Sequence, residues 1–239
     1  MPSIRAVSRR VAAFFFACAF LAPGLAASAH RVAQQPLPAV TVDDVIANLV
    51  SRNKGLTTFQ ARIAIRLHTG IPFLNPALEG DTYYKHPDRY EVVFTKYPSW
   101  AKSFEALYSD IGDPAVWYKR FFYTLHGTQT YKDHTDLVLR LTQRVRGEID
   151  HEDVLVDPRR WVIDEMEYVY YRGGRITVEQ TYRQESGFSV LDTQHAVIAM
   201  PPFPRARADA KYSDYRFNVA IDDSVFTKEK TQHIGVDPK

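Results

Sequence analysis

The sequence predicts a mainly β, α+β fold in which long antiparallel strands form one curved sheet and helices are few. From Thr58 onward, apolar and polar residues alternate with a period of two, as in a strand with one buried face. Gly173-Gly174 separates two long runs rich in Tyr, Val and Ile, which is typical of a β-hairpin. The regular alternation of strands and helices that marks a parallel sheet is absent from the sequence.

The first 29 residues have the pattern of a secretory signal peptide. Arginines at positions 5, 9 and 10 precede an apolar run over 11–25, and Ala27-Ser28-Ala29 forms a cleavage signal. We therefore expect this segment to be removed. The mature chain would begin at His30 and work in the periplasm or another extracytoplasmic compartment.

Three other interpretations of this segment are less favoured. Pro23-Gly24 interrupts the apolar run, which argues against an uncleaved membrane anchor. Bulky residues precede Cys18, which argues against lipid attachment there. Ala12 stands where a twin-arginine signal has a bulky apolar residue. The twin-arginine route is therefore the weaker of two export routes, and both stay open.

The predicted cleavage changes the charge balance and removes the only cysteine. The full chain has 30 Lys and Arg against 28 Asp and Glu, a net charge of +2. Removal of three arginines leaves 27 basic and 28 acidic side chains, a net charge of about −1, so we expect no nucleic-acid partner. Without Cys18 the mature chain has no disulfide and no thiolate nucleophile. Residues 30–239 are enough for one hydrophobic core.

One short helix is expected ahead of the strands. Residues 30–40 contain two prolines and no apolar period, which suits an extended leader. Thr41 is followed three positions later by Asp44, a pattern close to a capping box at the start of a helix. Apolar residues recur at helical spacing over 45–50, and Gly55 ends the helix.

Further apolar and β-branched runs predict the remaining strands. Besides the strand that starts at Thr58, we expect strands over 80–85, 89–96, 136–142, 160–171, 175–184, 189–200 and 206–217. Residues 98–109 carry apolar side chains three and four apart, which predicts a helix that covers the open face of the sheet. Trp100, Phe104 and Leu107 of this helix are the expected lid. Residues 228–239 are expected to form a polar C-terminal tail.

Side chains that can bind metal ions are present in the sequence, but their spacing does not form a recognisable metal site. The eight histidines are scattered, without a His-Glu-x-x-His motif. The densest group is Asp150-His151-Glu152-Asp153, which we interpret as a solvated loop because adjacent side chains splay apart. His134 with Asp133 and Asp136 is a weaker group still. We therefore expect no metal site.

Catalytic patterns are also missing from the sequence. It has no Gly-x-Ser-x-Gly elbow and no glycine-rich phosphate loop. Asp164, Glu165 and Glu167 are interpreted as the wet face of a strand rather than as a glycosidase pair. The sequence therefore predicts no catalytic residue and no cofactor, and a protein that is not an enzyme.

Aromatic residues are the main resource for binding. The chain has 14 Phe, 14 Tyr and 3 Trp, most of them on or beside the predicted strands. Each one taken alone is best explained as a core residue. However, the few predicted helices are not enough to cover the concave face of a curved sheet. This pattern favours an apolar cavity that accepts a lipid tail.

Three short motifs follow one another along the chain: residues 80–90, GDTYYKHPDRY, residues 179–182 after the Gly-Gly hairpin, and residues 210–218 running into 221–226. These motifs resemble those of LolA-like and LolB-like outer membrane lipoprotein-sorting proteins. Residues 80–90 resemble a strand-turn-strand unit of that superfamily, in which a Lys/Arg-x-Pro-x-Arg-aromatic turn is common, and the other two motifs are similar to its closing strands. The resemblance covers residues 41–227, and the order of the motifs carries most of its weight.

The resemblance implies an incomplete antiparallel β-barrel enclosing a hydrophobic cavity, with a short N-terminal helix and a helical lid. It implies a periplasmic carrier that binds acyl chains of lipoproteins or lipids and takes part in outer membrane lipoprotein sorting, with envelope membrane proteins as further partners. The alternative is an envelope sensor or assembly protein of the same fold that binds a protein partner.

The resemblance also suggests where a ligand would bind. In the lipoprotein carrier of the family, a basic residue before the turn proline is tied to opening of the lid. Here His86 stands at that place, flanked by Lys85 and Arg89, and these three are expected at a polar, gating rim. The expected lining residues lie on apolar strand faces and on the predicted lid: Phe59, Ile63, Ile65, Leu67, Tyr90, Val92, Phe94, Val169, Ile176 and Val178, with Trp100, Phe104 and Leu107.

Overall fold

The computed structural model describes residues 40–71, 75–87, 89–96, 114, 117–201 and 205–226, with only the backbone at 118 and 119. These residues belong to one compact unit, Ala39–Lys239. The predicted signal peptide, the lid helix over 98–109 and the C-terminal tail lie outside the described residues. So does nearly all of the predicted leader.

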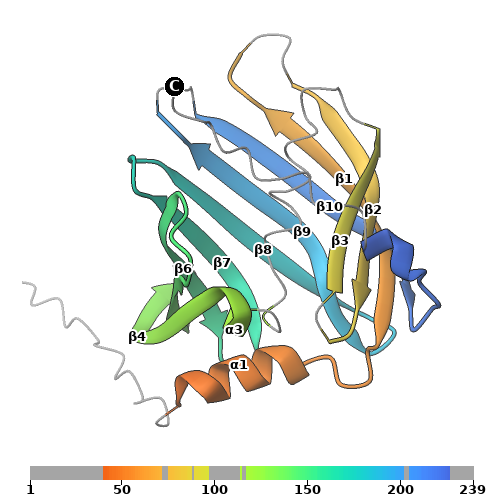
Figure 1. Ribbon diagram of the computed structural model, residues 1–239, viewed down its shortest axis with the longest axis horizontal. Coiled ribbons are helices and arrows are strands. Elements are labelled where there is room, and N and C mark those ends of the chain that lie inside the picture. The colour runs from red at the N-terminus through yellow and green to blue at the C-terminus, as the bar shows by residue number, and fades with distance from the viewer. Residues whose placement is uncertain are drawn as a thin grey trace, which may run out of the picture. The chain divides into compact units, whose positions relative to one another are not determined.

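The described part of the chain is dominated by one ten-stranded sheet. Its strands are β1 (Thr58–His68), β2 (Ala77–Lys85), β3 (Arg89–Lys96), β4 (Phe121–Tyr131), β5 (His134–Gln143), β6 (Ile149–Asp157), β7 (Val162–Tyr170), β8 (Arg175–Glu185), β9 (Phe188–Ala199) and β10 (Ala206–Phe217). Neighbouring strands are antiparallel, in the order β3-β2-β1-β10-β9-β8-β7-β6-β5-β4. The sheet is strongly curved (Figure 1). Its outer strands β3 and β4 are not paired with each other, so it forms an incomplete barrel and confirms the predicted fold class.

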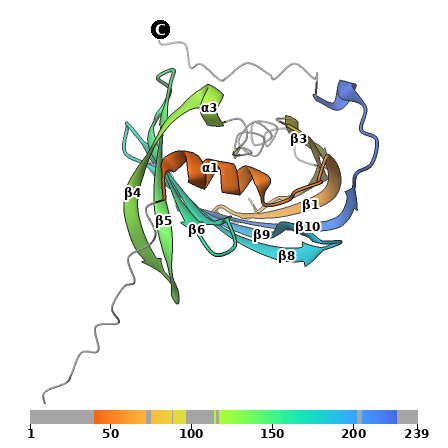
Figure 2. The ribbon, with the colours of Figure 1, turned by 90° about the horizontal axis from the view of Figure 1, so that it is seen from below.

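One α-helix of more than one turn is described, α1 (Val42–Ser51), and it begins as the sequence predicts. The Thr41 hydroxyl accepts a hydrogen bond from the Asp44 amide, and the Asp44 carboxylate accepts one from the Thr41 amide. This capping box satisfies two backbone donors that a helix start leaves free. Val45 and Leu49 are buried, and the helix lies on the inner side of the curved sheet (Figure 2). Within the described residues, no helix combines the length and apolar character needed to cross a bilayer.

Two strands depart from the prediction. β4 was not expected, because most of its residues are exposed and it forms an outer edge of the sheet. β6 contains residues 150–153, so their interpretation as a loop is wrong. Both neighbours, β5 and β7, supply ladder partners for β6, and these pairings outweigh the low β-propensity of acidic residues.

The sheet has one largely apolar face. On β1, Ala61, Ile63, Ile65 and Leu67 are buried, whereas the residues between them are exposed. Cross-strand pairing continues this face through Leu78 of β2 and the paired residues of β10. Further along the sheet it includes Val178 of β8, Met166 of β7, Val154 of β6 and Leu139 of β5. A single buried face is the expected result of period-two alternation.

Candidate functional site

A cavity of about 460 Å³ lies between α1 and one end of the sheet. The helix contributes Leu49 to Ser51, and residues 52–57 form the loop that leads into β1. The strands contribute the following residues: Phe59, Tyr84, Tyr90, Gln180, Tyr182, Ser189, Val190, Leu191, Gln194, Tyr212 and Tyr215. This volume lies within the range of about 300 to 1,000 Å³ that is typical of small-molecule pockets.

Aromatic rings in mutual contact form one wall of the cavity. The ring centroid of Phe59 on β1 lies 5.3 Å from that of Tyr84 on β2 and 5.5 Å from that of Tyr215 on β10. Tyr215 stacks in turn on Phe217, with centroids 5.6 Å apart. These separations are those of favourable aromatic pairs, so the wall is preformed.

A β-bulge in β10, opposite β1, allows two side chains of β10 at odd spacing to lie on the same wall of the cavity. The register shifts between Gln60 and Arg62 of β1, and Asp214 of β10 has a φ of +55°. One extra residue in a strand reverses the side on which the following side chains lie. Tyr212 and Tyr215, three positions apart, therefore both line the cavity.

The polar atoms of three tyrosines in the wall are already hydrogen-bonded within the protein. The Tyr182 hydroxyl donates to Gln180 Oε1 at 2.6 Å, and the Tyr212 hydroxyl donates to Gln194 Oε1 at 2.7 Å. The Tyr215 hydroxyl donates to the Leu191 carbonyl at 2.9 Å. Burial raises the pKa of both Tyr182 and Tyr215, so these phenols stay neutral. The wall offers uncharged aromatic surface with satisfied hydroxyls.

Charge in the described lining is of one sign. Arg52 and Lys54, in the loop after α1, are the charged residues of the described lining, and His86, directly after β2, also lines the cavity. The Arg52 guanidinium lies 5.0 Å from the centre of the Tyr182 ring. No Asp or Glu occurs among the described lining residues. Because cations attract anions, the described lining suits a ligand that is apolar with an acidic or electron-rich end.

Three of the predicted site residues line this cavity, namely Phe59, Tyr90 and His86. Another seven are buried in the sheet without lining it: Ile63, Ile65, Leu67, Val92, Phe94, Ile176 and Val178. The sequence pattern does not separate Phe59 and Tyr90 from these seven residues, because all of them lie on the apolar face of the strands, whereas His86 follows the end of β2. Trp100, Phe104 and Leu107 lie outside the described residues.

Val169 and the two cations of the predicted rim lie elsewhere. Val169 pairs with Arg175, whereas its neighbour Tyr168 pairs with Ile176. Strand alternation therefore places Val169 on the opposite face of the sheet from Ile176. Lys85 and Arg89 do not line the cavity but both donate to Asp223 Oδ1, from the ends of β2 and β3. They tie the 3₁₀ helix η3 (Asp223–Phe226) to this hairpin.

Several lining residues were missed from the sequence. The end of α1 and the loop with Arg52 and Lys54 have a sequence typical of any helix end, so nothing in it indicated a cavity. Tyr182, Tyr212 and Tyr215 stand within the motifs that carry the family resemblance, and the concentration of tyrosines there is the signal that could have found them. Gln180 and Gln194 gave no signal, because their role depends on a cross-strand pairing.

Comparison with known proteins identifies the fold through solved structures, not through related sequences. The sequence matches no protein-family model and no curated protein. Among solved structures, a LolA superfamily protein from Nitrosomonas europaea is similar, with a TM-score of 0.62, 16% identity and coverage of 80% of this chain and 99% of that one. The fold is LolA-like.

Two further structures share this LolA-like fold. A DUF1329 family protein from Desulfovibrio piger has a TM-score of 0.61 and 11% identity, covering 77% of this chain and 94% of that one. A putative outer membrane lipoprotein-sorting protein domain from Vibrio parahaemolyticus has a TM-score of 0.60 and 10% identity, covering 77% and 95%. The resemblance inferred from the motifs is thus confirmed at the level of the fold.

Proposed function

We propose that this protein is an extracytoplasmic carrier that binds the acyl chain of a lipid or lipoprotein in the cavity between α1 and the sheet. The observation that carries the proposal is the lining itself, in which a preformed aromatic wall with satisfied hydroxyls adjoins a cationic loop. The predicted signal peptide supports a site of action outside the cytoplasm. A role in outer membrane lipoprotein sorting is the specific form of the proposal that the shared fold suggests.

Burial of the chain would supply the binding free energy. Transfer of each methylene from water gains about 0.8 kcal/mol, so a fully buried sixteen-carbon chain gains on the order of 10 kcal/mol. Loss of translational freedom and of chain conformations opposes this gain. Extraction from a membrane is harder than extraction from water, since the chain is already in an apolar medium. Binding, not a chemical reaction, is therefore the proposed activity.

The cationic loop would select the polar end of the ligand. Arg52 and Lys54 are the charged groups of the described lining, so an acyl ligand with an anionic head is favoured over a neutral one of equal length. A hydrogen bond to a charged group contributes about 1.5 to 3 kcal/mol. We therefore expect roughly a tenfold or larger preference for palmitate over hexadecanol.

Displacement of a fluorescent long-chain fatty acid from the exported protein tests the proposal. Leu191→Trp places a larger side chain in the cavity but keeps the backbone carbonyl that receives the Tyr215 hydroxyl. We expect it to weaken palmitate binding at least about tenfold. Val197→Trp, on the same strand but outside the lining, is the matched control and should leave the affinity unchanged.

The head-group preference has its own comparison. Replacement of both Arg52 and Lys54 by Gln should weaken palmitate binding but leave hexadecanol binding unchanged.

Equal palmitate binding by wild type and Leu191→Trp would contradict the cavity as the site. If the protein binds neither amphiphile, the sensor or assembly protein that binds a protein partner becomes the better account of this fold.

A further inference from the structure

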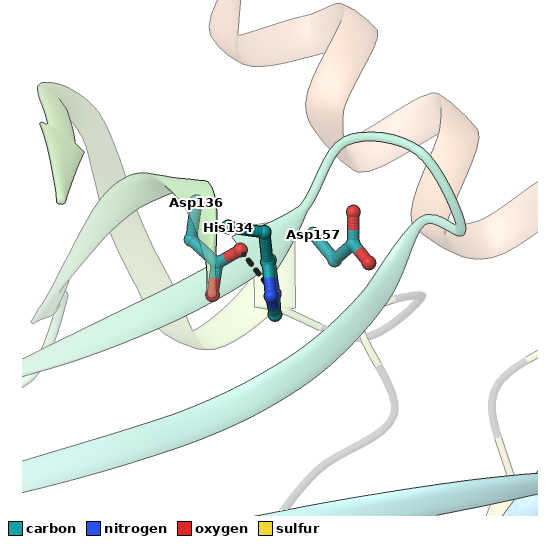
Figure 3. Close-up of side chains that lie close together, drawn as sticks. All are labelled: His134, Asp136 and Asp157. Carbon is teal, nitrogen blue, oxygen red and sulfur yellow. Dashed lines mark ion pairs between the residues drawn. The ribbon is translucent and has the colours of Figure 1, made fainter. Parts of the chain in front are cut away.

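A second polar site lies away from the cavity, at the ends of β5 and β6. His134 and Asp136 stand at the start of β5, and Asp157 is the last residue of β6. One potential ligand atom from each of the three lies within 4.8 Å of the other two. Figure 3 shows the Asp136 carboxylate directed toward the His134 ring, with Asp157 on the other side of that ring. Three potential metal ligands from two strands thus converge.

Asp136 is the unusual member of this group. Its side chain is 0% exposed, and neither carboxylate oxygen accepts a hydrogen bond from the residues that the structure describes. His134 Nε2 lies 3.0 Å from Asp136 Oδ1, but the hydrogen bond of that nitrogen goes to Asp164 Oδ2 at 2.8 Å. Burial, followed by the nearby charge of Asp164, raises the pKa of Asp136 to about 6. A buried carboxylate without donors is costly unless a cation compensates it.

His134 is oriented as a metal ligand would be. Its Nδ1 lies 3.1 Å from Asp133 Oδ1, and its side chain is 10% exposed. With the Nδ1 hydrogen donated to Asp133, loss of the Nε2 proton would leave a lone pair on a nitrogen that lies 3.0 Å from Asp136 Oδ1 and 2.8 Å from Asp164 Oδ2. A carboxylate behind the imidazole is the arrangement that commonly fixes the tautomer of metal-binding histidines. A cation at this position would replace the Nε2 proton.

The charge of the cluster also suits a divalent cation. Asp133, Asp136, Asp157 and Asp164 face two guanidinium groups, Arg159 and Arg160. With His134 neutral, four carboxylates against two guanidinium groups leave two negative charges in excess.

The present partners of Asp157 can be displaced. Arg159 and Arg160 both donate to its carboxylate. The two arginine side chains are 64% and 52% exposed, whereas the Asp157 side chain is 0% exposed. Because both arginine side chains reach solvent, they can turn outward when a cation takes their place at the carboxylate, whereas the Arg159 backbone amide keeps its hydrogen bond to Asp157.

We propose that His134, Asp136 and Asp157 bind a divalent transition metal ion of the zinc type. One imidazole with carboxylates suits zinc and its neighbours in the transition series, whereas magnesium and calcium prefer all-oxygen sites. The bound ion would join the start of β5 to the end of β6 and stabilise this part of the sheet. This proposal does not depend on the acyl-binding function, because none of the three residues lines the cavity.

Zinc binding to the exported, untagged protein after treatment with a chelator tests the proposal. Equilibrium dialysis with elemental analysis should give one zinc ion per chain. At zinc concentrations about a hundredfold above Kd, the thermal midpoint should rise by about 5 to 10 °C. Asp136→Asn and His134→Gln should each weaken binding at least about tenfold and abolish the thermal shift.

His151→Gln is the matched control. His151 also lies near two aspartates, 2.7 Å from Asp150 and 3.7 Å from Asp153, but outside the proposed site. Its replacement should leave zinc binding unchanged. Asp136→Asn replaces a buried carboxylate that accepts no hydrogen bond from the described residues by a neutral amide of the same shape, so the metal-free variant should be about as stable as wild type, which separates loss of zinc from loss of folding. Absence of zinc binding in wild type, or equal binding by Asp136→Asn, overturns the proposal.

Discussion

The Arg140–Asp153 pair shows how one contact makes stability depend on pH. Arg140 Nε and Nη2 each donate to the Asp153 carboxylate at 2.7 Å, across the β5–β6 ladder. This contact, helped by the positive charges of Arg140, His151 and His126, holds the pKa of Asp153 below its ordinary value of 3.8. Asp153 therefore stays ionised in the folded protein at pH values where the unfolded chain already binds a proton at this position.

The sign of the pH effect follows from that difference. The stability contributed by Asp153 is complete above a pH of about 4 and is lost as the pH falls through the folded-state pKa. We expect the unfolding free energy of wild type to fall more steeply below about pH 4 than that of Asp153→Asn. Urea denaturation over a pH series measures both slopes. The variants Arg140→Gln and Arg140→Gln/Asp153→Asn complete a double-mutant cycle, and parallel acid limbs in all four proteins would refute the assignment.

At the residue scale, sequence patterns predicted the positions of strands better than the surroundings of individual polar side chains. Asp164 was expected on the wet face of its strand, and this is wrong, because a register shift between β6 and β7 lies at that point and Asp164 is buried against His134 and Arg160. Asp157 gave no signal as a partner of His134, since the two belong to different strands. Only the pairing of β5 with β6 brings them together.

At the element scale, the start of α1 allows a direct test. The capping box of Thr41 and Asp44 satisfies backbone donors at the helix start, and the other end of the helix borders the cavity. Thr41→Ala should destabilise the protein by about 1 kcal/mol, the usual cost of losing an N-cap side chain. Chemical denaturation measures it. Ser51→Ala, at the exposed end of the same helix, should change stability by less than about 0.5 kcal/mol, and an equal loss in both variants would argue against the cap.

Elements with a clean apolar period were predictable from the sequence. β1 and the β7–β8 hairpin alternate strictly enough to be recognised without tertiary information. β4 and β6 do not, because β4 is an exposed edge and β6 places acidic residues on both of its faces. Their strand conformation is imposed by their neighbours in the sheet rather than by local propensity.

At the scale of the whole sheet, one pairing decides the topology. β1 pairs with β10, which brings the first and last strands of the described sheet together and makes β3 and β4 its two edge strands. Periodicity predicts strands but not their neighbours, so this pairing was not predicted; the family resemblance implied only an incomplete antiparallel β-barrel. The location of the cavity could not be predicted either, because six strands and the end of α1 meet there and periodicity does not show which strands are neighbours.

Native mass spectrometry of the protein recovered from its own envelope, followed by organic extraction, tests the central claim most directly. We predict a stoichiometric acyl lipid or lipoprotein on the wild-type chain and its loss in Leu191→Trp, with Val197→Trp loaded as wild type. A ligand-free mass for wild type, unchanged after incubation with palmitate or phospholipid vesicles, would contradict the carrier account.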